Sequence, residues 1–160
     1  MSTQYQAGYK MRALRKHIEE CVGDQIAQRL EAEMTDISLK LLPKHMGNGF
    51  NLMQQKYRAE FYFDRFPFKK YDPAVLFANV GAWILDHDLD RAESNGLRDP
   101  DIDVVLEDEN SAEVLVIIEF EEDIKIIECE NGGIKWRGKK WKIAEYEIWV
   151  AENLIDVVNR

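Results

Sequence analysis

Apolar and polar side chains alternate over residues 57–64, and from Pro73 onward this alternation gives way to the broader spacing of a helix. A period of two residues is typical of a strand with one buried face. The side chains expected on the buried face are Tyr57, Ala59, Phe61 and Phe63. Asp72 stands directly before Pro73, an N-cap acceptor followed by the residue best tolerated at the first helical position. The pattern therefore predicts a strand that leads through one short turn into a helix.

The predicted helix is apolar on almost every side. Its apolar residues are Val75, Leu76, Phe77, Val80, Trp83, Ile84 and Leu85. A helix with so wide an apolar surface is buried on more than one side, by its own sheet and by a second partner. The candidate core positions are Leu76, Phe77, Val80 and Trp83. Any apolar side that the core leaves uncovered is a candidate subunit contact.

The N-terminal part of the chain is expected to contain a loose tail, two helical segments and a strand. Residues 1–9 form the tail, and residues 9–22 have the 3–4 spacing of an amphipathic helix. Asp24 is expected to cap a short second turn after Gly23. Residues 32–42 alternate as a strand that Pro43 is expected to end. Residues 44–55, with two glycines, are expected to form a loop or hairpin tip.

Two further strands and a basic hairpin are expected in the second half of the chain. The segments are a turn at 94–100, a strand at 101–107, a turn at 108–111, a strand at 113–129, a turn at 131–133 and a strand pair around 137–139. On the long strand, Glu119, Glu121 and Asp123 share the face opposite the apolar one and form a candidate acidic interaction face. The last residues, 150–160, fit a helix.

These elements predict an α+β fold, with an antiparallel or mixed sheet packed by an N-terminal helix and a central buried helix. A chain of 160 residues is long enough for one domain with a sizeable core. We therefore expect a single domain over residues 1–160, in which residues 128–160 form a C-terminal extension. The first sixteen residues lack the apolar core of a secretory signal, and no window has the ~18 apolar residues of a membrane span. We expect no membrane partner.

The acidic side chains are concentrated in one stretch of the chain. The net charge is −9, but residues 86–130 alone carry 17 acidic and 3 basic side chains. Residues 1–85 carry 12 basic and 9 acidic side chains, and residues 131–160 carry 6 and 4. The acidic block repels a nucleic-acid backbone, which argues against sequence-specific binding of nucleic acid. It can instead dock a basic protein surface, mimic the charge of DNA, or serve as a solvated face that keeps the protein soluble.

Patterns that suggest metal chemistry are weak. Residues 86–90 resemble the start of a calcium loop, but Arg91 stands where that loop needs a glycine. Asp101 after Pro100, with Asp123 and Lys125, formally matches a metal-dependent nuclease. In so acidic a segment this match is expected by chance, and a nuclease needs a basic groove for the phosphates of its substrate. We expect no metal and no cofactor.

Nucleophilic catalysis and base stacking are also poorly supported. None of the histidines His17, His45 and His87 has a serine or cysteine placed beside it by a motif. Cys21 and Cys129 are too isolated to suggest a disulfide framework or a metal site. In residues 135–142 cations alternate with two tryptophans, which can stack bases. The interpretation we favour is that the tryptophans pack on the sheet while the lysines face water. We expect no enzymatic activity.

The segment from Phe61 to Leu85 resembles the tail completion, or tail terminator, family of contractile-tailed bacteriophages. The resemblance rests on the aromatic strand, on Tyr71-Asp72-Pro73, and on the helix AVLFANVGAWILDHD with Trp83 near its end. The flanking plan, an N-terminal helix and a later acidic segment, agrees over residues 10–125. Residues 128–160 exceed the short ending associated with the family.

The resemblance implies a non-enzymatic virion protein, assembled in the host cytoplasm. It implies a ring, with six subunits, that caps the tail tube, stops polymerisation and presents a surface to the head connector. The implied partners are further copies of the chain, the tail tube protein, the sheath and the head connector, and no catalytic residues are implied. Two other interpretations stay open: another head–tail joining protein, and an acidic DNA mimic or immunity-type inhibitor that binds a basic nucleic-acid enzyme.

Overall fold

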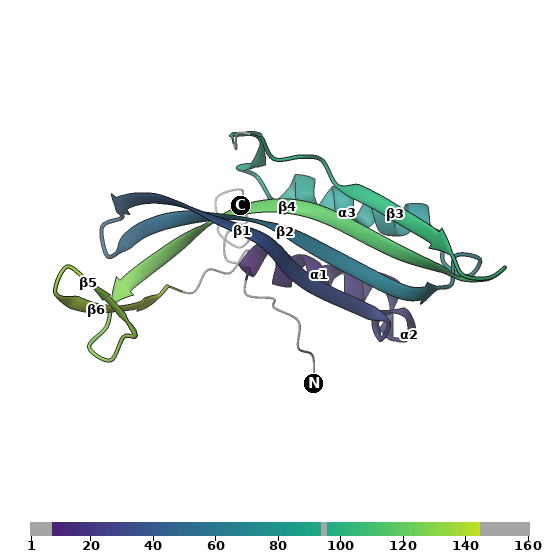
Figure 1. Cartoon of the computed structure of the whole chain (residues 1–160), viewed down its shortest axis with the longest axis horizontal. Coiled ribbons are helices and arrows are strands. Elements are labelled where there is room, and N and C mark those ends of the chain that lie inside the picture. The colour runs from purple at the N-terminus through teal and green to yellow at the C-terminus, as the bar shows by residue number, and fades with distance from the viewer. Residues whose placement is uncertain (1–7, 94–95, 145–160) are drawn as a thin grey trace, which may run out of the picture. The chain divides into compact units, whose positions relative to one another are not determined.

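The computed structural model describes residues 8–93 and 96–144 of the chain, shown in Figure 1. Its elements are α1 (Tyr9–Val22), α2 (Asp24–Ala27), β1 (Leu30–His45), β2 (Phe50–Phe66), α3 (Pro73–His87), the 3-10 turn η1 (Arg91–Glu93), β3 (Asp101–Leu106), β4 (Ala112–Glu128), β5 (Ile134–Trp136) and β6 (Lys139–Ile143). The N-terminal tail, except for its last two residues, and the C-terminal helix expected from the sequence lie outside the described residues.

The strands form one sheet in the order β1-β2-β4-β6-β5, and β3 pairs with β4 outside this path. The pairs of β3 with β4, of β4 with β6 and of β5 with β6 are antiparallel. With two long helices beside a sheet, the α+β class expected from the sequence is confirmed. The chain contains two compact units: unit 1 comprises residues 1–36 and 57–120, and unit 2 comprises residues 37–56 and 121–160.

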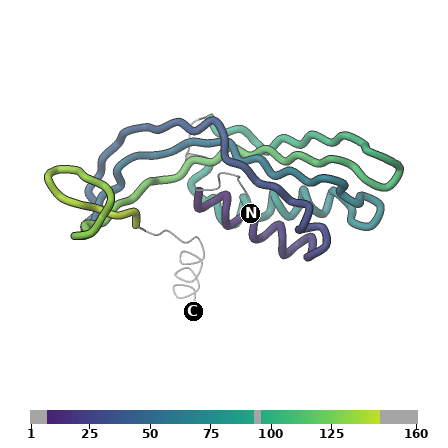
Figure 2. The backbone as a smooth tube through the Cα atoms, turned by 60° about the horizontal axis from the view of Figure 1, so that its bottom comes forward, coloured from purple at the N-terminus to yellow at the C-terminus, as the bar shows by residue number. Residues whose placement is uncertain are grey.

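Unit 1 contains the main core of the protein. In Figure 2, α1 and α3 lie on the same face of its sheet. The buried side chains on the strands of this unit alternate along the chain, as the sequence predicts. They are Leu30, Ala32 and Met34 on β1, Tyr57, Ala59, Phe61 and Phe63 on β2, and Val114, Val116, Ile118 and Phe120 on β4. From α1, Met11, Leu14 and Ile18 pack into the same core, so the N-terminal helix covers the sheet as expected.

Unit 2 is a smaller antiparallel assembly that ends in a hairpin. Its described part contains no helix. A two-residue turn connects β5 and β6, and both of its residues, Arg137 and Gly138, have positive φ angles of 52° and 71°. Two successive positive φ angles are those of a type I′ turn, which matches the twist of a two-stranded hairpin. The basic hairpin predicted around residues 137–139 is therefore confirmed.

The cap of α3 is confirmed, whereas the cap predicted for α2 is wrong. Asp72 Oδ1 accepts a hydrogen bond from the Ala74 amide at 2.9 Å, as an N-cap side chain should. Asp24, by contrast, is the first residue of α2, and Gly23 takes the cap position without any side-chain hydrogen bond. Asp24 still lies in the first turn, where a carboxylate interacts favourably with the helix dipole.

Two boundaries in the first hairpin differ from the prediction. Pro43 does not end β1, which continues to His45. β1 is an edge strand, and edge strands tolerate proline because one side of the strand makes no ladder hydrogen bonds. The loop expected over residues 44–55 shrinks to a tip between His45 and Phe50, closed by a hydrogen bond from the Met46 amide to the Gly49 carbonyl at 2.7 Å.

Candidate interaction surfaces

Helix α3 buries one side and exposes a second apolar side. Leu76, Val80, Trp83 and Ile84 are buried, and the Trp83 ring lies edge-on to Phe120 of β4 at 6.3 Å. Phe77, which the sequence analysis placed in the core, is half-buried. The exposed apolar positions of the helix are Ala74, Val75, Ala78, Ala82 and Leu85.

The exposed positions of α3 follow a regular spacing. Steps of three and four residues place them in one stripe along the helix. Leu85 is 80% exposed, far more than an apolar side chain on a covered helix face. The sequence predicts a second burial partner for this helix, and the described part of the chain does not supply it.

Strand β3 carries a second group of exposed apolar side chains in unit 1. All six of its residues are exposed. Ile102 and Val104 stand opposite Val116 and Val114 of β4, which are buried on the helix side of the sheet. Ile102, Val104 and Leu106 thus lie on the same side of the sheet as α3 but remain uncovered.

The other side of β3 carries two aspartates and the exposed Val105. Asp101 and Asp103 alternate with the apolar residues and stand opposite Ile117 and Leu115. Residues 99–109 contain six acidic side chains and no basic one. In the described residues β3 pairs with β4 alone, so its outer edge presents unpaired backbone groups. We call β3 with its exposed side chains the acidic edge.

Unit 2 contains an exposed apolar segment of β1 whose charge is opposite to that of the acidic edge. Residues 37–42 of β1 contain no acidic side chain. Ile37, Leu39 and Leu41 alternate on one side of the strand, and all three are exposed, Leu41 by 74%. Lys40 lies between them and is exposed as well. β1 ends the strand order, so its outer edge is also unpaired in the described sheet. We call residues 37–42 the basic edge.

The candidate acidic face of β4 is only partly available. Glu119, Glu121 and Asp123 alternate on one side of the strand, and all three are half-buried. Glu119 lies in unit 1, and its carbonyl oxygen accepts a hydrogen bond from Arg91 Nη1 at 2.8 Å. Glu121 and Asp123 lie in unit 2. The more exposed acidic residues are those of β3 and of the turn that follows it.

The Asp-rich segment after α3 forms a buried ion network. Lys10 Nζ from α1 lies 2.6 Å from Asp88 Oδ1 and 3.1 Å from Asp90 Oδ1, and Arg91 Nη1 lies 3.1 Å from Asp88 Oδ2. The Asp88 side chain is fully buried, whereas that of Asp90 is largely exposed. These contacts fasten α1 to the end of α3. They give residues 88–90 a structural role at the end of α3.

The electrostatics of this network follow from burial and pairing. Burial alone lowers the pKa of Lys10, but the hydrogen bond and charge of Asp88 outweigh it, so that the pKa is raised above 10.5. Burial likewise opposes the charged form of Asp90, yet Lys10 holds the pKa of this carboxyl below 3.8. Both shifts favour the charged forms that make the pairs.

The two halves of the nuclease-like pattern fall in different units. Asp101 lies in unit 1 opposite Ile117, and Asp123 lies in unit 2, six positions further along β4. A different acidic group gathers in unit 1, where one carboxylate oxygen from each of Asp64, Glu107 and Glu113 lies within 4.8 Å of the others. Two of the three are exposed, and no further feature of this group indicates an ion.

The histidines and cysteines have structural surroundings. The His45 ring lies edge-on to Phe50, and the His87 ring lies tilted against Trp83. Cys21 Sγ contacts His17 Nε2 at 3.4 Å. Burial, aided by the charge of a neighbouring glutamate, raises the pKa of the Cys21 thiol, which makes it a poor nucleophile at neutral pH.

The basic hairpin of unit 2 packs its aromatic side chains together. Trp141 is buried, Trp136 is half-buried, and both rings lie close to Phe50, at 5.6 and 4.8 Å. The Arg137 guanidinium covers the Trp136 ring at 4.4 Å. Lys139 and Lys140 are exposed. The favoured interpretation, tryptophans packed and lysines in water, is confirmed.

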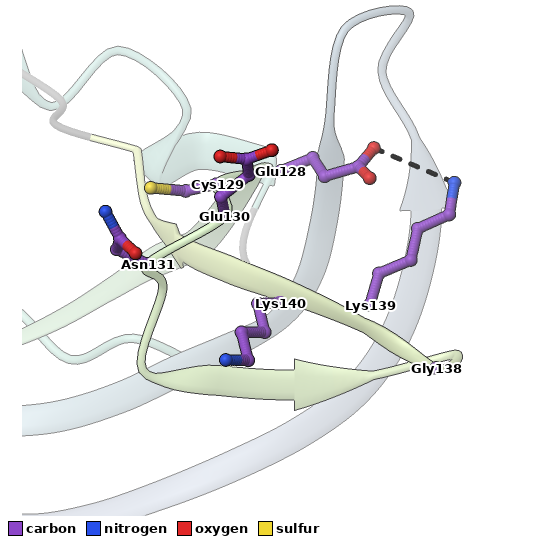
Figure 3. Close-up of a pocket in the computed structure, with 7 residues that line it drawn as sticks. All are labelled: Glu128, Cys129, Glu130, Asn131, Gly138, Lys139 and Lys140. Carbon is purple, nitrogen blue, oxygen red and sulfur yellow. Dashed lines mark ion pairs between the residues drawn. The ribbon is translucent and has the colours of Figure 1, made fainter.

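Figure 3 shows an open depression between the end of β4 and this hairpin. It is lined by Glu128, Cys129, Glu130, Asn131, Gly138, Lys139 and Lys140. Lys139 Nζ and Glu128 Oε2 lie 3.7 Å apart, and both side chains are exposed. The lining mixes both charges and offers no apolar wall, unlike the enclosed apolar pockets that bind small molecules.

None of the helices among the described residues is long and apolar enough to cross a membrane. The model of the family described as P2 phage tail completion protein R (GpR) matches residues 8–146. The chain belongs to this family. The protein is thus a phage tail completion protein, and the resemblance noted in residues 61–85 is confirmed.

A relative of this tail completion protein occurs in Haemophilus phage HP1 (strain HP1c1), where it is described as an uncharacterized 19.2 kDa protein in the rep-hol intergenic region. The two are 31% identical over 114 residues, which cover 71% of this chain and 67% of the relative. No solved structure gives a significant match. The family match extends to residue 146, so it includes the β5–β6 hairpin that the sequence analysis placed beyond the family's ending.

Proposed function

We propose that this tail completion protein caps the end of the tail tube as a ring, most simply a hexamer. The cap stops the growth of the tube and presents a surface that the head connector meets. In this role the protein binds further copies of itself, the tail tube protein and the sheath. It acts as a structural component without catalytic activity and assembles with the tail in the host cytoplasm.

One observation carries the proposal of a ring: two unlike surfaces, each with exposed apolar side chains, lie on different units of the chain. Side chains such as Leu85 and Leu106 in unit 1 and Leu41 in unit 2 are more than 70% exposed. Grouped exposed apolar residues mark interaction sites. When one surface of a subunit fits a different surface of its neighbour, the contacts repeat head to tail until rotation closes a ring.

The experiment is electron microscopy of tails assembled with and without the protein. We expect tails of defined length when the protein is present and overlong tubes when it is absent. Adding the purified protein to growing tubes should stop their elongation and leave a density at one end. A protein that stays monomeric, leaves tube ends bare and does not change tail length would refute the proposal.

A further inference from the structure

We infer that the basic edge of one copy adds to the acidic edge of the next copy as an antiparallel strand, so that the sheet continues across the subunit contact. This inference rests on the proposed ring and names the two segments that join its subunits. It concerns residues 37–42 of β1 and residues 101–106 of β3.

Both segments are edges with unused backbone groups. In the described sheet β1 pairs with β2 alone and β3 with β4 alone. β3 is six residues long. On β1, Asp36 has a positive φ of 52°, and Pro43 lacks an amide hydrogen. Six residues lie between them, and this length equals that of β3.

One alignment makes three apolar pairs on one side of the two strands. Full antiparallel overlap places Ile37 opposite Leu106, Leu39 opposite Val104 and Leu41 opposite Ile102. All six of these apolar side chains are exposed in the single chain. Shifts by one or two residues leave at most two apolar pairs, whereas full overlap makes three, so the side-chain pattern favours this register.

The same alignment also pairs opposite charges. It sets Lys40 opposite Asp103 on the other side of the strands, where it also sets Ser38 opposite Val105 and Leu42 opposite Asp101. Both charged side chains of the Lys40–Asp103 pair are exposed, and no acidic residue lies within residues 37–42. Opposite charges directly across antiparallel strands stabilise the pair, and like charges destabilise it. The charge difference between the edges therefore favours the unlike contact and disfavours pairing of two acidic edges.

Helix α3 adds apolar surface beside the contact. It lies on the same side of the sheet as Ile102 and Val104, which stand opposite residues of β4 buried beneath the helices. Its exposed stripe, with Leu85 as the most exposed member, extends the apolar surface on that side. The contact would supply the second burial partner that the described part of the chain does not provide for this helix.

The decisive experiment blocks one edge in each of two variants and then mixes them. Leu41→Asp blocks the basic edge, and Val104→Asp blocks the acidic edge. Ile143→Asp is the matched control, because Ile143 is also an exposed apolar strand residue but lies outside both edges. Sedimentation velocity measures the size of the assembled protein, both free in solution and bound to purified tube ends.

We expect wild-type protein and Ile143→Asp to form the same ring-sized species. Each edge variant alone should lose this species, and their equimolar mixture should form dimers but nothing larger, since one intact edge of each kind remains. The inference is overturned if either variant assembles as wild type does, or if the mixture stays monomeric. Circular dichroism must show that each variant is folded. Leu41→Lys repeats the test with the opposite charge, and Ile102→Asp repeats it at a neighbouring position of the acidic edge.

Cross-linking tests the register. A chain with Leu39→Cys and Val104→Cys should form a ladder of disulfide-linked multimers under oxidation, because these positions stand opposite each other across the contact. A chain with Leu39→Cys and Val105→Cys should not, since the second thiol lies on the other side of the strand. Equal ladders from both chains would exclude the antiparallel alignment.

The outcomes separate this inference from the proposed function. If tube capping persists while the edge variants assemble normally, the function stands and the edges are not the contact. If wild-type protein never self-associates but Val104→Asp abolishes its binding to tube ends, the acidic edge docks a tube subunit and the inference is wrong. If neither capping nor self-association occurs, both the function and the inference fail.

Discussion

Replacing Lys10 with methionine is expected to destabilise the fold by about 3 kcal/mol. Removing one partner of a buried ion pair costs about 3–5 kcal/mol, because the remaining charge stays buried and uncompensated. The Asp88 carboxylate is fully buried but keeps Arg91 at 3.1 Å. This second partner places the expected loss at the lower end of the range. The pair with Asp90, whose side chain is 66% exposed, adds only about 0–1 kcal/mol.

Replacing the other partner, Asp88→Asn, should lower the free energy of unfolding further, by about 4–5 kcal/mol. It leaves two cations without their shared carboxylate, and both are largely buried, since the side chains of Lys10 and Arg91 are only 6% and 15% exposed. The double variant Lys10→Met with Asp88→Asn should cost less than the two single costs added together, because each partner is harmful mainly when the other remains.

Urea denaturation at neutral pH, followed by tryptophan fluorescence and circular dichroism, measures these free energies of unfolding. Asp90→Asn is the matched control and should change the free energy by less than about 1 kcal/mol. The reasoning is refuted if Asp90→Asn destabilises as much as Asp88→Asn, or if Lys10→Met is neutral. Either result would mean that the network is solvated and does not fasten α1 to α3.

Three further predictions concern other parts of the chain. The pKa of Asp90 is lowered in the folded protein. Its contribution to stability is therefore present above pH 3.8 and is lost as the pH falls through the lower folded pKa. Asp90→Asn should make an acid unfolding curve flatter in that pH range. Gly132→Ala should destabilise the hairpin by about 1–3 kcal/mol, because a Cβ at this position would lie 2.1 Å from a main-chain oxygen of β6. A Cβ at Gly133 would meet no atom within 4 Å, so Gly133→Ala should be neutral in a thermal melt. Burial and a hydrogen bond to Glu113 raise the pKa of Tyr62 to about 12; Glu113→Gln should lower this value in an ultraviolet titration, and an unchanged titration would contradict the pairing.

The elements encoded by short-range patterns were predictable. The alternation of β2 and β4 and the 3–4 spacing of α1 each need only the period of the local structure. The start of α3 is equally local, because Asp72 and Pro73 act within one turn. Boundaries that depend on neighbours were predicted less well. Pro43 lies inside β1 because that strand forms an edge, and no local pattern reports which strand lies beside which.

The candidate surfaces could be predicted only in part. The sequence indicates that α3 is too apolar for one partner and that acidic residues gather after it. It does not reveal that Phe77 is only half-buried, that Asp88 is buried against Lys10, or that the side chains on both sides of β3 are exposed. Each of these depends on contacts between residues far apart in the chain, such as positions 10 and 88.

The sequence by itself thus determined the period, and hence the type, of each main element, together with the family, because both are properties of residues close in sequence. Tertiary structure alone decided which apolar residues are covered. Val114 and Val104 look alike in the sequence, yet the first is buried beneath the helices and the second is 48% exposed at the sheet edge. Burial depends on what packs against a residue in space, and that is settled only when the strands have taken their order.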